Sequence, residues 1–369
     1  MPPKSPNQHF ITKSYMKQWA DDSGKVGVVC LHHRGSALVS PKGLHHVRDM
    51  SSHELENKWS RYEDQAMQVL GEFKMKITPD ASDDELAEAE RYLSNPDRLA
   101  VLVDFIALHH ARSLVVPLQQ WIDPTAMGSN AESETAIRER WETVRDHYGR
   151  SGIEITVYPE ETPVTLGAIP VFDEQDWGVR PPGTARFLMP LTPRMVIGGT
   201  PDWSPSQIRV IPGSVDHETL LALLIGCVPG MFNTSYLICE PSALERTTET
   251  ALRLFEGGNW HWYAICNRIN LCGSSAPSAL RVDWRQRTIR HVRNQGLLGI
   301  STTTSPTKRR LRRSMAEDAR KIQHDLDGLN VPICACDRHR SNPEVSALWK
   351  ATMPQAICDE MRRQRNTHQ

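Results

Sequence analysis

The hydrophobic periodicity of this chain changes once, from helical to extended, and that change limits the folds it can adopt. Between residues 51 and 149, apolar side chains recur three and four positions apart, which is the spacing of one helix face. From about residue 153 they occur in short runs such as IEITVY and RMVIGG, separated by Pro, Gly and Asp. This order predicts an α+β fold, in which N-terminal helices and a β-hairpin pack on a small mixed sheet and a helical extension follows at the C-terminus.

Capping residues define where the helices begin. Ser51 is followed by Glu54, and this spacing is typical of a capping box. Asn95 is a cap candidate, and Pro96 stands at the first helical position, where its missing N–H costs nothing. We therefore expect helices over 51–73, 82–93, 95–118 and 134–149, with a loop over 123–135.

The opening stretch QHFITKSYMKQW, residues 8–19, predicts a short amphipathic helix. Ile11, Tyr15, Met16 and Trp19 fall on one side of it, and Thr12 is the expected cap. Two β-rich runs separated by HHRGS follow at 26–31 and 37–40, and they predict the hairpin.

The charge of the chain is unevenly distributed. The net charge is −1, but residues 281–321 carry twelve Lys and Arg side chains against three acids, a local charge of +9. We expect a linker at 299–308 and a basic helix at 311–329, whereas the segments ALRVDW and TIRHV before them are ambiguous. The predicted domains are residues 1–257 and a basic Cys- and His-containing region, 258–369.

Several motifs in the first two thirds of the chain point to one family. The motifs are QHFITKSYMKQWAD, GKVGVVCL, ELENKWSRYEDQAMQVL and DFIALHHARS, with later similarity in PVTLGAIPVF and TARFLMPLTPRMVI. Together they resemble the bacterial domain-of-unknown-function family 4238 over residues 8–257. The chain departs from the family pattern in having Thr12 in place of Pro and in lacking an acid in LGAIPV. The resemblance implies the fold and a soluble bacterial protein, and it supplies no reaction.

The opening stretch also contains residue types suited to hydrolysis of a phosphodiester or related bond. An imidazole next to an ammonium group can combine acid–base catalysis with stabilisation of an anion. The alternative is that these side chains only pack the edge of the core and cover the wet face of the helix. The predicted catalytic residues are His9, Lys13, Tyr15, Arg112 and Asn233.

Thiols and an imidazole near the C-terminus have separations that zinc sites use. The predicted zinc ligands are Cys266, Cys272, Cys334, Cys336 and His339. The alternative is buried thiols that act as small hydrophobic residues. The doublets 32–33, 45–46 and 109–110 are weaker metal candidates because adjacent side chains point in different directions, and we expect His110 to be a core residue with satisfied hydrogen bonds.

Two arginine-rich segments are the candidates for binding nucleic acid, because clustered arginines neutralise phosphates and release counterions. Trp284 lies among them and is a candidate for stacking on a base. The alternative partner is an acidic protein surface. The predicted nucleic-acid-binding residues are Arg285, Arg287, Arg290, Arg293, Lys308, Arg309, Arg310, Arg312 and Arg313.

The leading prediction is a bacterial cytoplasmic protein that binds RNA or DNA through residues 281–321, in a defence or mobile-element system. No apolar run is long enough to span a bilayer, so we expect no membrane partner. The alternatives are the hydrolase described above and a structural module for protein–protein interaction.

Overall fold

We describe the protein from a computed structural model of its 369 residues. The residues it describes are 7–9, 11–30, 34–44, 46–48, 52–74, 77, 81–122, 130–167, 170–173, 187–200, 204, 207–218, 220–221, 236–256, 265, 268–269, 272, 276–298 and 306–331.

The N-terminal helices begin at locally encoded caps, mostly where the sequence predicts them. Thr12 caps α1 (Lys13–Met16), which continues as the 3-10 turn η1 (Lys17–Trp19). The Ser82 hydroxyl accepts from the backbone N–H of Glu85, and the Glu85 carboxylate accepts from the N–H of Ser82, so a complete capping box opens α3. Asn95 caps α4, with Asp97 N 2.9 Å from Asn95 Oδ1. The long N-terminal helices are α2 (His53–Lys74), α3 (Asp83–Leu93), α4 (Pro96–Ile122) and α5 (Asn130–Tyr148).

The largest sheet in the described part of the chain has five strands in the order β10-β5-β9-β8-β7. The β10–β5 pair is parallel and the other pairs are antiparallel, so the sheet is mixed, as predicted. Its strands are β5 (Gly152–Val157), β7 (Phe172–Asp173), β8 (Phe187–Thr192), β9 (Met195–Thr200) and β10 (Ile208–Pro212).

The predicted hairpin is part of a second sheet, which has four strands in the described part of the chain. Strand β2 (Val26–Cys30) pairs with β3 (Gly35–Val39) on one side and with β11 (Tyr236–Cys239) on the other, and β6 (Leu166–Gly167) completes the order β3-β2-β11-β6. Every residue of β2 is buried, so this strand needs neighbours on both edges and both faces. A separate pair joins β1 (Asn7–His9) to β4 (His46–Arg48), and η2 (Pro41–Gly43) lies between β3 and β4.

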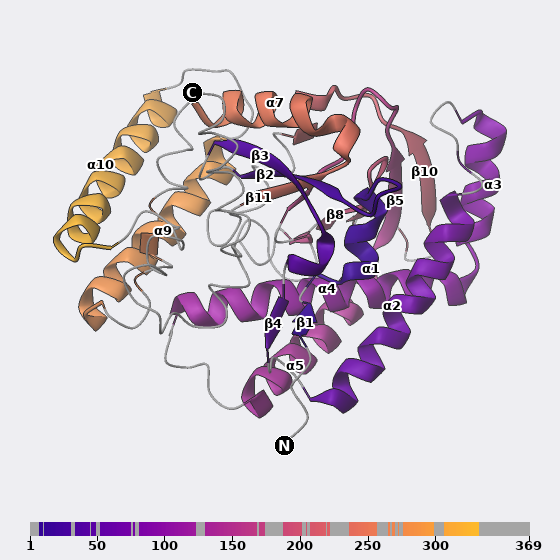
Figure 1. The fold of residues 1–369 in the computed structure, drawn as a ribbon, viewed down its shortest axis with the longest axis horizontal. Coiled ribbons are helices and arrows are strands. Elements are labelled where there is room, and N and C mark those ends of the chain that lie inside the picture. Colours follow the sequence, from indigo (N-terminus) through magenta and orange to yellow (C-terminus); the bar gives the residue numbers. More distant parts are fainter. Residues whose placement is uncertain are drawn as a thin grey trace.

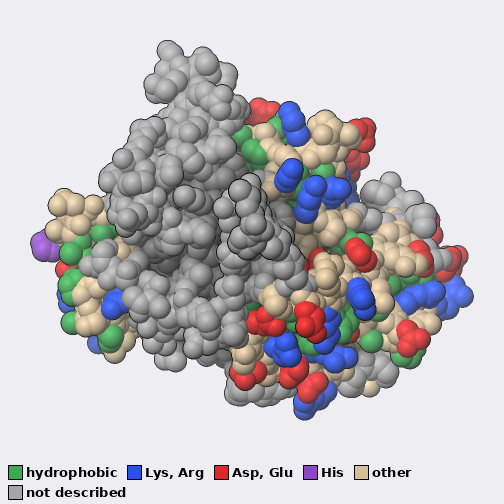
Figure 2. Space-filling model, turned by 60° about the horizontal axis from the view of Figure 1, so that its bottom comes forward, with side chains coloured by type: hydrophobic (Ala, Val, Ile, Leu, Met, Phe, Trp, Pro, Cys, Tyr) green, Lys and Arg blue, Asp and Glu red, His purple; other side chains and the backbone are tan. Residues whose placement is uncertain are grey.

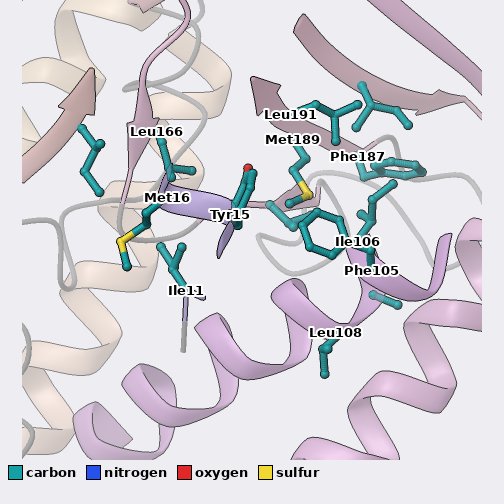
Figure 3. Close-up of a cluster of buried hydrophobic side chains, with 14 of the residues drawn as sticks. Ile11, Tyr15, Met16, Phe105, Ile106, Leu108, Leu166, Phe187, Met189 and Leu191 are labelled. Carbon is teal, nitrogen blue, oxygen red and sulfur yellow. The ribbon is translucent and has the colours of Figure 1, made fainter. Parts of the chain in front are cut away.

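One apolar core connects these layers. The fully buried Tyr15 ring lies edge-on to Phe105 of α4, with ring centroids 5.3 Å apart. Figure 3 shows Tyr15 between this helix and the side chains of Met189 and Leu191 from β8. The Trp19 indole N–H donates to the Val164 carbonyl at 2.8 Å. Large aromatic side chains each remove about 150–250 Å² from water, so this contact between α1, α4 and β8 is a major source of stability.

Of the three long C-terminal helices among the described residues, the last two lie on the opposite side of the molecule from α2 and α3, and the first lies over the sheet that contains β2 and β3 (Figure 1). They are α7 (Leu244–Glu256), preceded by η4 (Pro241–Ala243), then α9 (Ser278–Leu298) and α10 (Pro306–Gly328). The basic helix thus begins at Pro306, earlier than the predicted residue 311, because proline is favoured at the first helical position. Trp284 and Ile322 join the main core cluster, so the core continues across the boundary predicted at residue 257.

Helix α9 is continuous over a range in which the sequence pattern indicates only short, ambiguous segments. Its buried side includes Thr288, His291 and Asn294 next to Trp284. These residues recur at helical spacing, but most of them are polar, so a search for apolar periodicity does not detect the helix.

None of the helices in the described ranges combines the length and the hydrophobicity that crossing a bilayer requires.

The pairing of β8 with β9 requires a residue without a side chain at Gly199. A Cβ atom there would lie 1.9 Å from Cε1 of Phe187. We expect Gly199→Ala to lower the free energy of unfolding by about 1–3 kcal/mol, because the Phe187 ring must leave its packed position. The exposed helical Gly71 has no heavy atom within 4 Å of a Cβ, so Gly71→Ala is the matched control and should stabilise by about 0.5–1 kcal/mol. Denaturant unfolding of both variants measures this, and equal effects would contradict the packing described here.

Candidate nucleic-acid interface

A buried carboxylate joins α10 to α9. Asp318 is 7% exposed and forms ion pairs with both Arg287 and Arg290, and Arg290 Nη1 lies 3.3 Å from its Oδ2. Arg287 also donates to Asp283, with Nε 3.0 Å from Oδ2, and Lys321 Nζ lies 3.3 Å from the same oxygen. Cationic and anionic side chains therefore alternate along this network, which links α9 to α10.

Within this network, the contact between Arg287 and Asp283 shifts the pKa of both groups toward their charged forms. The hydrogen bond from Arg287 is the main reason why the pKa of the Asp283 carboxyl lies below its usual value. The same bond raises the pKa of Arg287. Carboxylates therefore lie beside both Arg287 and Arg290, and these ion pairs hold α10 against α9. Binding of nucleic acid by these two arginines stays a prediction.

Trp284 is also part of this helix contact. Its side chain is almost fully buried, and its indole N–H donates to Asp325 Oδ2 at 3.2 Å. Because the ring faces are covered by protein, the predicted stacking of Trp284 on a base is wrong for this arrangement.

The first half of α10 presents the remaining arginines to solvent. Arg309, Arg310, Arg312 and Arg313 are all exposed, and no acid occurs in the helix before Glu317. Within the described residues, no carboxylate pairs with Arg310, Arg312, Arg313 or the exposed Arg320, which the sequence analysis missed. The side chains of Arg285, Arg293 and Lys308 lie outside the described part of the structure.

The position of the first of these cations, Arg309, opposes the helix dipole, whose effect falls off within the first turn. The N-terminal end of a helix carries a partial positive charge, so acids are favoured there and cations are disfavoured by about 0.3–1 kcal/mol each. The first turn of α10 contains no acid. An arrangement that breaks a local stability rule is typical of a functional surface.

Charge is distributed differently elsewhere on the molecule. On the face shown in Figure 2, Lys and Arg side chains intermingle with Asp and Glu over the described surface to the right, so their fields largely cancel. The exposed arginines of α10 are not mixed with acids in this way in the first half of the helix. We call Arg309, Arg310, Arg312 and Arg313 the α10 arginine cluster.

The predicted catalytic residues do not assemble into an open site in the described structure. Lys13 is exposed at the start of α1, whereas Tyr15 is fully buried and donates its hydroxyl hydrogen bond to the Pro190 carbonyl. Burial raises the pKa of Tyr15 well above its ordinary value. The side chain of His9 and all of Asn233 lie outside the described residues, so their roles stay predictions.

Arg112 is a core residue rather than an open anion site. Its side chain is buried, with Nη1 2.7 Å from Glu63 Oε1 and Nη2 3.5 Å from Glu56 Oε1. Its Cζ lies over the Trp59 ring, 5.0 Å from the ring centroid. Burial raises the pKa of Glu63 to about 7, and the charge of Arg112 acts against that shift. In this structure the guanidinium of Arg112 is thus occupied by two acidic side chains, and its predicted role in stabilising a substrate anion stays a prediction.

A buried polar chain links α4, α5 and β7. The Tyr148 hydroxyl contacts His110 Nδ1 and donates to Asp173 Oδ2 at 3.0 Å, so its oxygen accepts from His110 Nδ1–H. The other ring nitrogen, Nε2, lies 3.5 Å from Arg140 Nη2. Burial lowers the pKa of His110 to about 3, and the charge of Arg140 adds to this effect. The expectation that His110 is a hydrogen-bonded core residue is confirmed.

The zinc prediction falls largely outside the described residues. Cys272 is buried, whereas Cys266, Cys334, Cys336 and His339 lie in ranges that the structure does not describe. Among the described residues, no three His, Cys, Asp or Glu side chains are grouped so that they could hold a metal ion. Zinc binding stays a prediction.

Comparison with known proteins tests the family assignment for the part of the chain that contains α1 to α5. Residues 7–148 match the family described as Protein of unknown function (DUF4238). The resemblance seen in the sequence is thereby confirmed for these residues, and the match ends at Tyr148 rather than near residue 257. No curated protein and no solved structure gives a significant match.

The DUF4238 match includes Tyr15, Arg112 and His110 but not the helix pair α9–α10. These three buried residues therefore lie within the range that matches the family, whereas the α10 arginine cluster lies outside it.

The Asp318 network predicts a specific loss of stability. Asp318→Asn keeps the shape of the side chain but leaves two guanidinium groups without their buried anion, and we expect a loss of about 3 kcal/mol in the free energy of unfolding. Glu317→Gln, the neighbouring exposed acid, is the matched control and should change stability by less than about 0.5 kcal/mol. Denaturant unfolding measures both, and an unchanged Asp318→Asn protein would contradict the network.

Protonation of His110 predicts how stability depends on pH. Because its folded pKa is about 3 and an unfolded histidine has a pKa near 6.5, below that value the unfolded chain binds a proton that the native protein does not. Stability should fall with acidification from about pH 6.5 toward 3. In His110→Gln the slope between pH 4 and 6 should be lower by about 1.4 kcal/mol per pH unit.

The control for this experiment is His324→Gln, because the His324 ring is 91% exposed. An identical slope in His110→Gln and the wild-type protein would show that His110 does not remain neutral in the fold.

Proposed function

We propose that this protein binds nucleic acid electrostatically, through the α10 arginine cluster. The observation that carries the proposal is the set of adjacent exposed guanidinium groups without carboxylate partners among the described residues, Arg310, Arg312 and Arg313. Arginine is suited to this role because it is always charged and its planar fork matches the oxygens of a phosphate.

The arginines of α9 and α10 differ in their contacts, and this difference supports the proposal. Arg287 and Arg290 of α9 form ion pairs with Asp318 of α10, and Arg287 also pairs with Asp283. These ion pairs therefore do not involve the arginines in the first half of α10. A polyanion that approaches α10 meets cations on a rigid element that is already ordered. Preorganisation of this kind lowers the entropy cost of binding.

The geometry gives less support to the other candidates. A hydrolase that uses Arg112 would need its guanidinium to leave Glu63 and Glu56. An acidic protein partner fits the sign of the charge, but the series of phosphates on a nucleic acid fits closely spaced arginines better. A cytoplasmic location and a role in bacterial defence or in a mobile element belong to the same proposal, since both bring a protein into contact with nucleic acid.

Salt-dependent binding tests the proposal. With the full chain and a labelled duplex, we expect the logarithm of the binding constant to fall linearly with the logarithm of salt concentration. The triple variant Arg310→Gln, Arg312→Gln, Arg313→Gln should lose about three phosphate contacts, which lowers the slope by about 2.7 and the affinity in ~0.1 M salt by at least ~10-fold.

The matched control removes the same net charge elsewhere. Arg61, Arg91 and Arg150 are exposed on other helices or turns, and their triple Gln variant should bind as the wild-type protein does. Equal losses in the two triple variants would mean that only net charge matters, and the proposal would then be wrong.

A further inference from the structure

The exposed face of α10 presents cations in three directions around one axis. Arg309 and Arg313 are one turn apart and share the centre of the face, and Arg320 continues that line about 10 Å further along. Arg310 and Arg312 are two positions apart, so they point to opposite flanks, about 160° from one another. A central row with a cation on each flank is therefore built into this helix.

This arrangement matches a groove with phosphates on both walls. A single strand offers one line of phosphates, which cannot meet both Arg310 and Arg312 while it also follows the centre. An α-helix with its side chains is about 10–12 Å wide, and the major groove of B-form DNA is ~12 Å wide. The major groove of an A-form RNA duplex is too narrow and deep for such an element.

The helix pair also lacks the groups with which proteins hold unpaired bases. Single-strand binders stack bases on aromatic side chains. The sequences of α9 and α10 contain one aromatic residue of the Phe, Tyr and Trp class, Trp284, and it is buried against Asp325 and the core.

The position of α10 permits close approach. The helix lies at the edge of the molecule with α9 behind it (Figure 1). Met315, Asp318, Ile322 and Leu326 face the protein and are buried, whereas the cations are on the other side. The side that contains Arg309, Arg313 and Arg320 can therefore enter a groove without unpacking the helix.

The geometry points to the major groove of B-form duplex DNA as the ligand of α10, with Arg310 and Arg312 on phosphates of opposite walls and Arg309, Arg313 and Arg320 along the groove between them. This inference rests on the proposed function and narrows its substrate class.

The test compares one sequence in several forms. Fluorescence anisotropy with the full chain in ~0.1 M salt uses a 20-base-pair DNA duplex, the RNA duplex of the same sequence and each single DNA strand. We expect the DNA duplex to bind at least ~10-fold more tightly than the RNA duplex or the single strands. Methyl green, which occupies the major groove, should compete with the protein, and netropsin, which occupies the minor groove, should not.

A single substitution gives an independent measurement. Glu317 is exposed one turn after Arg313. Because its carboxylate would lie near the phosphates, Glu317→Gln should tighten binding to the DNA duplex by about 2- to 5-fold. Glu249→Gln removes an exposed acid from α7 and should leave the affinity unchanged.

The outcomes separate this inference from the proposed function. RNA duplex or single strands bound as tightly as the DNA duplex, or competition by netropsin alone, would overturn the groove inference and leave nucleic-acid binding standing. Absence of binding to any nucleic acid would overturn both. This holds whether or not the protein binds polyglutamate, which serves as a model of an acidic protein partner.

Discussion

The ion pairs of Asp318 are the interaction on which the surface of the α9–α10 pair depends. A carboxylate that is 7% exposed is costly to bury unless cations accompany it, and Arg287 and Arg290 provide them. Together with the buried side chains of Met315, Ile322 and Leu326, this pairing determines which side of α10 faces the protein. The arginines on the other side are directed to solvent as a consequence, so the structural charges and the exposed charges on the same helix pair have separate roles.

The same physical logic applies in the part of the chain that matches the family. Arg112 is buried between Glu63, Glu56 and Trp59, and His110 is kept neutral between Tyr148 and Arg140. Each polar group is surrounded by partners from a second or third helix or strand, as buried polar groups require. Residue types that resemble those of an active site in the sequence form contacts here that join α2, α4, α5 and β7.

Local signals could be predicted from the sequence, and pairings between distant segments could not. The caps Ser82 and Asn95 act on the next few residues, so the starts of α3 and α4 were predicted correctly. Arg112 pairs with Glu63, 49 residues away, and Arg287 pairs with Asp318, 31 residues away. The spacing of residues along the sequence does not predict such pairs. Helix α9 escaped detection because polar residues such as Thr288 and His291 occupy its buried face. The positive charge of residues 281–321 was therefore evident, but the division between paired and exposed arginines needed the fold.

The most direct test of the central claim is arginine footprinting. Phenylglyoxal modifies exposed guanidinium groups, and mass spectrometry of the full chain with and without duplex DNA reports the modification rate at each arginine. We expect DNA to slow modification of Arg310, Arg312 and Arg313, while the rates at Arg61, Arg91 and Arg150 stay the same. Unchanged rates across α10 in a DNA-saturated sample, or protection confined to the other three, would contradict the claim.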